Sequence, residues 1–424
     1  MENDIDNNFS EVLDVAATAG HILLENGAEI SRVEETMSRI ATHFGVSSSN
    51  FFVLSNGIFT TGSNRRIEHK DNYANVEFIP IKAIQFDRVV AVGQLSYDIS
   101  AGRCTLQQAK ERLEEIRRMP AKPDWEQLLA TAVGAGGFCA VFGGGWLDCA
   151  AAFAVGALLF LFTQVLSSKY LSKIVGGVCN AIVGTFLSVL FCRIGFGHSL
   201  SDIIIGAMMP LIPGVPFVNG VRDLANSDYI AGLTRLTDAV LGFFCIAIGV
   251  IVTFVTDGVL FGESIVLEGM SVSAQTAGLV WQALLSGVAT MGFAALFGVP
   301  RSRYATCGFI GAFGWVLYLV LTRYAGAVSV FATVVSATVV CLLSRIAAVR
   351  HKTPSSVYLI CGLFPLIPGA GIFWSMYYLV SEQFSLSFSS LGTALKVAVA
   401  IVMGIILGME LPQRLFAGRK VRRS

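Results

Sequence analysis

Charged residues are scarce in this chain. Asp, Glu, Lys and Arg make up 14% of its 424 residues, whereas 54% are hydrophobic. A soluble domain carries roughly 25% charged residues, so the composition predicts a membrane protein that lies in a lipid bilayer. The formal net charge is only +1, which argues against nucleic acid as a partner.

Sequence motifs for disulfide, metal or nucleotide chemistry are also missing. The nine Cys form no CxxC pair, so they predict neither a disulfide framework nor a metal site and are expected to pack as small apolar residues. The glycine-rich run 134–145 lies inside an apolar stretch, and no Lys-Ser/Thr pair follows it. It therefore indicates close helix packing rather than a phosphate-binding loop. No cofactor is expected. No signal peptide is expected either, because the first residues are acidic and lack an apolar core.

Most of the charge that is present lies in residues 1–123, which are expected to form a soluble α+β domain. Apolar residues at helical spacing predict one helix over 9–24. Ser31 is expected to cap a second helix, in a capping box with Glu34, and Gly45 is expected to end it. Strands are predicted within 51–62 and 75–81, and helices over 86–100 and 105–118. Residues 120–123 read as a linker.

Catalysis in this domain is not expected, because its nucleophile and base candidates show no motif spacing: His21, His43, His69 and Cys104. A cluster of carboxylates with two arginines is more informative. It predicts either a solvated helix face with weak ion pairs, or a regulatory or substrate-access role at a pore mouth. Its members are Glu25, Glu29, Glu34, Glu35, Arg32 and Arg39.

The rest of the chain contains two copies of one unit. Pro210-Leu211-Ile212-Pro213-Gly214 returns as Pro365-Leu366-Ile367-Pro368-Gly369, and flanking positions match at a similar offset. Ten apolar stretches long enough to span a bilayer are predicted, five in each copy. They lie near 125–142, 147–167, 173–192, 200–216, 237–256, 277–298, 304–321, 327–347, 355–373 and 392–411.

An odd number of spans per copy means that the two copies enter the membrane from opposite sides, as in inverted-repeat transporters. We expect a first module at 124–256, an extracytoplasmic connector at 257–276, a second module at 277–411 and a basic tail at 412–424. Lys and Arg gather in the loops on the side of residues 1–123 and in the tail. The positive-inside rule therefore predicts that both termini are cytoplasmic.

The repeated motif predicts a broken helix in each module. Two prolines three residues apart remove backbone donors, and the following glycine permits a non-helical turn. Freed backbone groups at membrane depth are tolerated where they line a cavity, so paired breaks that face one another are expected to form a substrate site. The alternative is a pair of packing kinks. The expected substrate-binding residues of the motif are Pro210, Pro213, Gly214, Pro365, Pro368 and Gly369.

Ionisable residues near the spans are few, and at membrane depth they are functional candidates. Asn219, Arg222 and Asp223 follow the first motif, whereas the second leads into the aromatic stretch 373–378. We therefore expect the chemistry on the side of 219–223 and shape selection on the side of 373–378. The alternative for Arg222 and Asp223 is one interfacial ion pair that holds a loop. Asp238 lies near the inner end of its span.

This layout resembles the threonine/serine exporter family. The resemblance rests on three blocks that cover nearly the whole chain, although each alone is weak. They consist of Gly27, Arg32, Glu34 and Gly45; Pro210, Pro213, Gly214, Asn219, Arg222, Asp223 and Leu224; and Pro365, Pro368, Gly369, Ala370 and Gly371. The family implies efflux of small hydroxy amino acids driven by the proton motive force. In some relatives the two modules are separate chains implicated in dicarboxylate export.

On this basis we expect a secondary transporter for a small molecule. Backbone groups at Gly214 and Gly369 would orient a carboxylate, Arg222 would be its counter-charge, and Asp223 or Asp238 would carry the proton. A dicarboxylate exporter, a channel and a membrane-anchored enzyme remain alternatives, and homo-oligomerisation stays open. Ten spans with duplicated breaks exceed what anchoring requires, which disfavours the enzyme.

Overall fold

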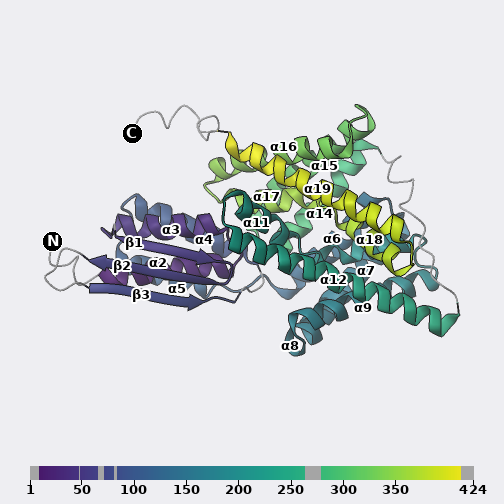
Figure 1. The fold of residues 1–424 in the computed structure, drawn as a ribbon, viewed down its shortest axis with the longest axis horizontal. Helices are drawn as coiled ribbons and strands as arrows, with labels where there is room; N and C mark the ends of the chain where they lie inside the picture. Colours follow the sequence, from purple (N-terminus) through teal and green to yellow (C-terminus); the bar gives the residue numbers. More distant parts are fainter. Residues whose placement is uncertain (1–8, 47, 65–70, 81–83, 263–277, 412–424) are drawn as a thin grey trace.

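The computed structural model describes residues 9–46, 48–64, 71–80, 84–262 and 278–411. Two parts follow one another along its longest axis. The N-terminal domain occupies one end, and a bundle of long helices occupies the other (Figure 1). The bundle makes the chain a polytopic helical membrane protein.

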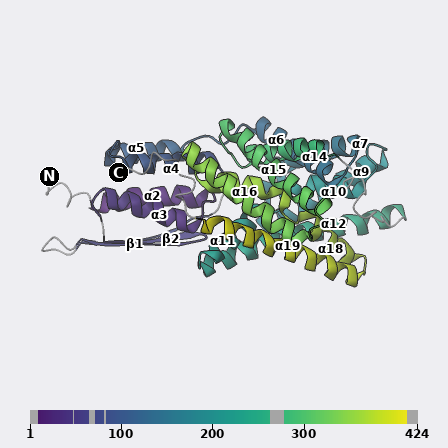
Figure 2. The same cartoon turned by 90° about the horizontal axis from the view of Figure 1, so that it is seen from above.

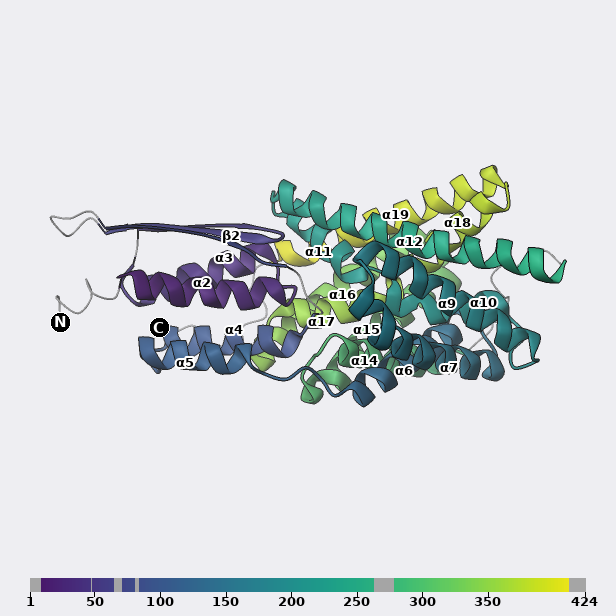
Figure 3. The ribbon, with the colours of Figure 1, turned by 90° about the horizontal axis from the view of Figure 1, so that it is seen from below.

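The N-terminal domain has three layers (Figures 2 and 3). One face of an antiparallel sheet, of order β1-β2-β3, is covered by α2 and α3, which are covered in turn by α4 and α5. The bounds are α2 Phe9–Glu25, α3 Ile30–His43, β1 Ser49–Leu54, β2 Gly57–Asn64, β3 Asp71–Phe78, α4 Phe86–Ser100 and α5 Leu106–Arg117. Phe59 pairs with Phe52 on one side and with Val76 on the other, which sets the register.

The start of α3 differs from the sequence prediction. The helix begins at Ile30, and Ser31 lies in its first turn rather than capping it. Glu34 is not available for a capping box, because its Oε1 accepts a hydrogen bond from the Val53 amide of β1 at 3.1 Å. Burial raises the pKa of this Glu34 carboxyl. A capping box does form at α5, where Thr105 and Gln108 exchange bonds.

The membrane region repeats one order of elements. The first set is α6 Asp124–Phe142, α7 Trp146–Phe162, the π-helical turn Thr163–Ser167, α8 Ser168–Tyr170, α9 Lys173–Arg193, α10 Leu200–Met208, the 3-10 turn Met209–Leu211, α11 Gly214–Ala225 and α12 Tyr229–Phe261. The second set is α14 Leu279–Leu296, the 3-10 turn Arg301–Arg303, α15 Tyr304–Arg323, α16 Ser329–His351, α17 Ser355–Leu363, the 3-10 turn Phe364–Leu366, α18 Gly369–Val380 and α19 Phe384–Glu410.

Within the described residues, seven helices are long and apolar enough to cross a membrane, or nine when each bent pair counts as one span. The bent pairs are α10 with α11 and α17 with α18. The remaining predicted span, α6, is not among the nine. Its first turn is polar, since it contains Asp124, Glu126 and Gln127. The number ten therefore stays a prediction.

Small residues let corresponding helices of the two sets approach closely. A Cβ at Gly137 of α6 would lie 2.9 Å from the Ala289 Cβ of α14, and one at Gly292 would lie 2.9 Å from the Ala130 carbonyl. Gly134 faces the ring of Phe293. The glycine-rich run thus forms a helix contact rather than a phosphate loop.

Two helices are longer than the apolar stretches that predicted them. Helix α12 covers Tyr229–Phe261 instead of 237–256, and α19 covers Phe384–Glu410 instead of 392–411. The polar ends of α12 are stabilised by ion pairs, including Arg193 with Asp257 at 2.6 Å. Residues 257–261 are consequently helical rather than the start of a connector. The rest of the predicted connector, 263–276, and the tail 412–424 lie outside the described residues.

Candidate functional site

The two Pro-Leu-Ile-Pro-Gly segments adopt nearly the same backbone. Ile212 and Ile367 both leave the helical region, with ψ of 124° and 129°, and the prolines that follow have ψ of 54° and 47°. Each proline pair interrupts the helical hydrogen bonds. The chain resumes as α11 or α18 after a bend of 59° in the first pair and 45° in the second. The sequence motif therefore produces two broken helices.

The two breaks pack against each other. A Cβ at Gly214 would lie 2.9 Å from Ile367 Cδ1, and a Cβ at Gly369 would lie even closer to Ile212 Cδ1. Each glycine thus contacts the isoleucine of the other break. Glycine is required at both positions because a side chain would separate the two segments.

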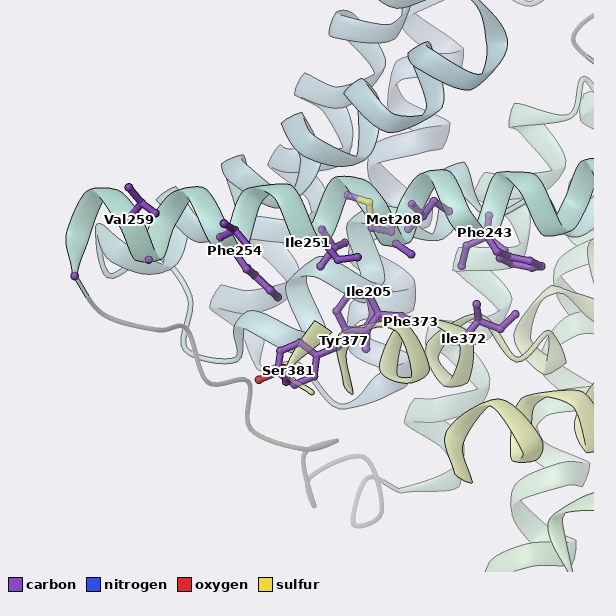
Figure 4. A pocket seen from close by; sticks show the side chains of 18 residues that line it. Ile205, Met208, Phe243, Ile251, Phe254, Val259, Ile372, Phe373, Tyr377 and Ser381 are labelled. Atoms are coloured by element: carbon purple, nitrogen blue, oxygen red, sulfur yellow. The ribbon is translucent and has the colours of Figure 1, made fainter. Parts of the chain in front are cut away.

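A cavity of about 380 Å³ lies beside the breaks on the side away from the N-terminal domain, here called the far side. It is enclosed by α10, α12 and α18, and it reaches the breaks at Ile212 and Gly369. Figure 4 shows Phe254 of α12 and Tyr377 of α18 on facing walls; their rings meet edge to face with centroids 6.0 Å apart. The lining is otherwise largely aliphatic and aromatic.

Helices α11 and α17 run from the breaks toward the N-terminal domain, and the region between them and that domain is here called the near side. A buried polar cluster lies there, where the α2–α3 turn meets α11 and α12. Arg222 pairs with Glu29 at 2.6 Å, and Arg235 pairs with Asp223 at 2.8 Å. Arg235 also donates to the Ala28 carbonyl at 3.0 Å, and Asn219 donates to the Gly27 carbonyl at 3.1 Å.

The local sequence explains this arrangement. Residues 219, 222 and 223 are spaced three and four apart, so they share one face of α11. The turn at Gly27 has φ +83°, which favours glycine, and it presents the two carbonyls to that face. The cluster contains two cations and two carboxylates and is neutral overall. Buried charges are stable only when they are paired in this way.

Two connected polar cavities lie on the near side. The smaller has a volume of about 210 Å³, and the larger, of about 700 Å³, shares Arg32, Arg345 and Ser355 with it. The larger one has four cationic residues in its lining, Arg32, Arg103, Arg345 and Lys352. Its one carboxylate is Asp98, and hydrogen bonding to Arg103 holds the pKa of Asp98 below its usual range. The lining of the smaller cavity is Glu29, Ser31, Arg32, Glu35, Arg222, Cys341, Ser344, Arg345, Ser355, Leu359 and Met409.

The structure separates the residues that the sequence predicted as one site. Pro210, Pro213, Gly214, Pro365, Pro368 and Gly369 form the paired breaks. Asn219, Arg222 and Asp223 lie on the near side against the N-terminal domain. Arg222 and Asp223 do not pair with each other, because each has its own partner.

Other predicted residues are placed as follows. Asp238 is not part of this cluster: it pairs with Lys173 at 3.1 Å, and the two side chains are 39% and 78% exposed. Gly27 forms the docking turn, and Arg32 lines both near-side cavities. Glu34 bonds to β1 within its own domain.

The solvated-face interpretation of the carboxylate cluster is wrong for Glu29 and Glu25, because both are buried, and Glu29 forms an ion pair with the membrane bundle. Glu35 and Arg39 do form an exposed pair. Of the enzyme candidates, His21 pairs with Glu77, and Cys104 is buried away from it. No group of three metal-binding side chains occurs among the residues that the structure describes.

Sequence reasoning missed several members of the near-side site. Arg235 is only 4% exposed and pairs with Asp223. Ser344 and Arg345 of α16 also line the small cavity. Their spacing gives no signal, because they come from a helix distant in the sequence. Only the carboxylate cluster itself indicated a contact near a pore mouth.

Comparison with known proteins decides the family. A family model described as "Putative threonine/serine exporter" matches residues 14–256, which is more than half of the chain, and a second, "Threonine/Serine exporter, ThrE", matches residues 282–410. The chain belongs to the threonine/serine exporter family. Both broken helices thus lie within the residues that the two family models match.

Relatives of this exporter family include both complete and partial matches. The "Threonine/serine exporter" of Corynebacterium glutamicum is 24% identical over 413 residues, which cover 95% of this chain and 83% of that protein. The "Probable threonine/serine exporter" of Mycobacterium tuberculosis is 24% identical and covers 70% of this chain and 56% of its own length. The "Probable succinate transporter subunit YjjP" of Klebsiella aerogenes is 24% identical over 54% of this chain and 87% of that protein. No solved structure matches the chain.

Proposed function

We propose that the chain exports small amino acids of the threonine/serine type across the cytoplasmic membrane, driven by the proton motive force. The paired breaks carry this proposal. They pack against each other between an apolar cavity on the far side and a polar cavity on the near side. Alternating access requires a barrier whose two sides open in turn, and the paired breaks are the proposed barrier.

The proposed topology has ten spans in two inverted sets of five, with the N-terminal domain in the cytoplasm. It is supported by the repeated order of helices and by the reciprocal contact of the two breaks. In this topology the near-side cavities face the cytoplasm. An amino acid would enter there, pass the breaks as they separate, and leave through the far-side cavity.

In this proposal, Arg222 provides the counter-charge for the substrate carboxylate. Its guanidinium lines the small near-side cavity, and its Nε and Nη1 have no hydrogen-bond partner among the described residues. Asp223 is the better candidate for the coupling proton, since it is fully buried beside Arg235 and lies in the same cluster. Asp238 is half-exposed and lies outside this cluster.

Counterflow in proteoliposomes tests the proposed function. Vesicles loaded with unlabelled threonine or serine should accumulate the labelled amino acid, and an imposed proton gradient should drive net transport that a protonophore abolishes. Arg222→Gln should reduce both the counterflow accumulation and the gradient-driven transport. Transport that ignores the proton gradient would indicate a channel. Full transport activity of membrane-inserted Arg222→Gln protein would show that Arg222 is not part of the substrate site.

A second candidate is dicarboxylate export. It is supported by the relatives whose printed names describe succinate transporter subunits and by the cationic lining of the larger near-side cavity, with Arg32, Arg103, Arg345 and Lys352. Counterflow of labelled succinate in the same vesicles discriminates between the two. Succinate accumulation without threonine accumulation would favour this second function.

A further inference from the structure

The smaller near-side cavity is built from three parts of the chain. The start of helix α3 in the N-terminal domain provides Glu29, Ser31, Arg32 and Glu35. Helix α11 provides Arg222, and α16, α17 and α19 provide the remaining wall. Positively and negatively charged side chains therefore surround a cavity of about 210 Å³. This volume is below the roughly 300–1,000 Å³ of pockets for drug-sized ligands, so it suits a small molecule.

Charged side chains that line this cavity have buried atoms without a hydrogen-bond partner among the described residues. Arg222 and Glu29 are 3% and 4% exposed and share one bond, from Arg222 Nη2 to Glu29 Oε2 at 2.6 Å. Arg222 Nε and Nη1, Glu29 Oε1 and Arg32 Nε have no hydrogen-bond partner within the described part of the chain. A buried polar atom without a partner costs about 1–3 kcal/mol, more when it is charged. A ligand that satisfies these atoms would recover that free energy.

The free atoms have complementary chemistry. The free Nε–H and Nη1–H of Arg222 lie on different edges of its guanidinium, and each can donate a hydrogen bond to a carboxylate oxygen. The free Glu29 oxygen accepts a hydrogen bond, which an ammonium group donates. Ser344 and Ser355 add hydroxyl groups to the lining. A molecule that carries a carboxylate, an ammonium and a hydroxyl group on a short carbon chain satisfies all of them, whereas a dicarboxylate would place its second negative charge near Glu29 and Glu35.

We propose that this cavity binds a zwitterionic amino acid and that the N-terminal domain supplies its ammonium site through Glu29. Arg222 and Arg32 hold the carboxylate, and Glu29 distinguishes amino acids from simple carboxylates. The N-terminal domain is then part of the binding site and not only an appendage of the bundle. This assignment rests on the proposed export function.

Analogue competition against labelled threonine tests the assignment with the full chain in proteoliposomes. Threoninol retains the ammonium and lacks the carboxylate, and 2,3-dihydroxybutyrate retains the carboxylate and lacks the ammonium. Wild-type protein should prefer threonine over both. Glu29→Gln should weaken threonine binding by about tenfold or more, as expected for a lost hydrogen bond to a charged group. The inhibition constant of 2,3-dihydroxybutyrate should stay the same or fall.

A structural defect would instead weaken all three ligands alike, so the ratio of their inhibition constants is the decisive readout. Glu126→Gln is the matched control, because Glu126 forms a 2.6 Å ion pair with Arg301 that also joins distant parts of the chain and lines none of the near-side cavities. It should leave the ratio unchanged. Equal weakening of all ligands by Glu29→Gln, or no change, overturns the assignment while threonine counterflow by the wild type still supports export.

A second measurement avoids disturbing the ion pair. Ser31 is exposed and lines the cavity, so Ser31→Cys should fold normally and introduce a thiol at its edge. Saturating threonine should slow maleimide labelling of that thiol, read by peptide mapping in detergent, more than 2,3-dihydroxybutyrate does. Labelling that threonine does not slow would overturn the site. Wild-type protein without threonine counterflow or binding would contradict both the function and the site.

Discussion

The first break leads into α11, which presents Asn219, Arg222 and Asp223 to the N-terminal domain. The second break leads into α18, whose Phe373 and Tyr377 line the far-side cavity. Yet the backbones of the two breaks are nearly identical, with prolines at ψ of 54° and 47°. One motif therefore produces the same break twice, and the helix that follows each break determines which side chains lie beside it.

In the proposed pathway, this asymmetry would place polar recognition at one end and apolar contact at the other. An amino acid that leaves the near-side cavity would lose its charged partners at the breaks and meet aromatic rings beyond them. Tight binding on the far side would oppose release. We therefore expect an exporter to bind its substrate on the near side and to filter it by shape on the far side.

The largest expected effect comes from removing a charge on the polar side. Arg235→Met would leave Asp223 and the Ala28 carbonyl without their bonds to Arg235 in a buried site. Loss of one partner of a buried pair costs about 3–5 kcal/mol. We expect the free energy of unfolding in detergent to fall by that amount, measured by chemical denaturation.

Lys173→Met is the control for this change, because it removes an ion pair whose side chains are 78% and 39% exposed. Surface pairs contribute about 0–1 kcal/mol. If Arg235→Met and Lys173→Met lose equal stability, the buried cluster contributes no more than an exposed ion pair does. It then does not distinguish the first break from the second.

A smaller effect is expected where the two breaks are alike. Gly214→Ala and Gly369→Ala each insert a methyl group against an isoleucine of the opposite break. Overpacking of this kind typically costs about 1–3 kcal/mol. Both variants should therefore lose stability in thermal denaturation and slow counterflow, even though alanine favours helices.

Gly392→Ala provides the matched control, since Gly392 lies in α19 and a Cβ there would have no neighbour within 4 Å. It should be neutral or slightly stabilising. A loss confined to only one of the two break variants would show that the breaks do not move as an equivalent pair.

Filtering by shape on the apolar side should be a still smaller effect. Phe373 lines the far-side cavity at 7% exposure, and Phe373→Leu would widen it. One methylene group in an apolar pocket changes discrimination by about tenfold or more. We expect isoleucine to compete with labelled threonine about tenfold better in this variant.

The control is Phe309→Leu, because Phe309 is exposed on α15 and lines none of the described cavities named above. It should leave the competition unchanged. If Phe373→Leu alters neither isoleucine nor threonine, the aromatic side does not select by shape.

Much of this fold could be predicted from local patterns. Apolar length predicted the long helices, and the proline pairs predicted the two breaks, because the lost backbone donors act within one turn. Helix ends were predicted less well, since α12 continues past its apolar stretch to Phe261 with Asp257 held by Arg193.

The candidate site could be predicted only in part. Arg222 and Asp223 stood out as charges near a span, but their partners depend on docking of a domain nearly two hundred residues earlier in the chain. Nothing in the spacing of Glu29 or Arg235 indicates this contact. The alternative interpretation, an ion pair between Arg222 and Asp223, followed from adjacency, and in the structure Arg222 instead pairs with Glu29 and Asp223 with Arg235.

The smallest expected effect is at the other acidic candidate, Asp238. Asp238→Asn removes a half-exposed pair with Lys173 and should change stability by less than about 1 kcal/mol. It should also leave the dependence of threonine transport on an imposed proton gradient unchanged. Asp223→Asn should instead abolish that dependence while exchange counterflow persists, because Asp223 lies in the polar cluster beside the substrate cavity. If only Asp238→Asn abolished the dependence of transport on the proton gradient, the proton would be transferred on the exposed face of α12, away from the first break.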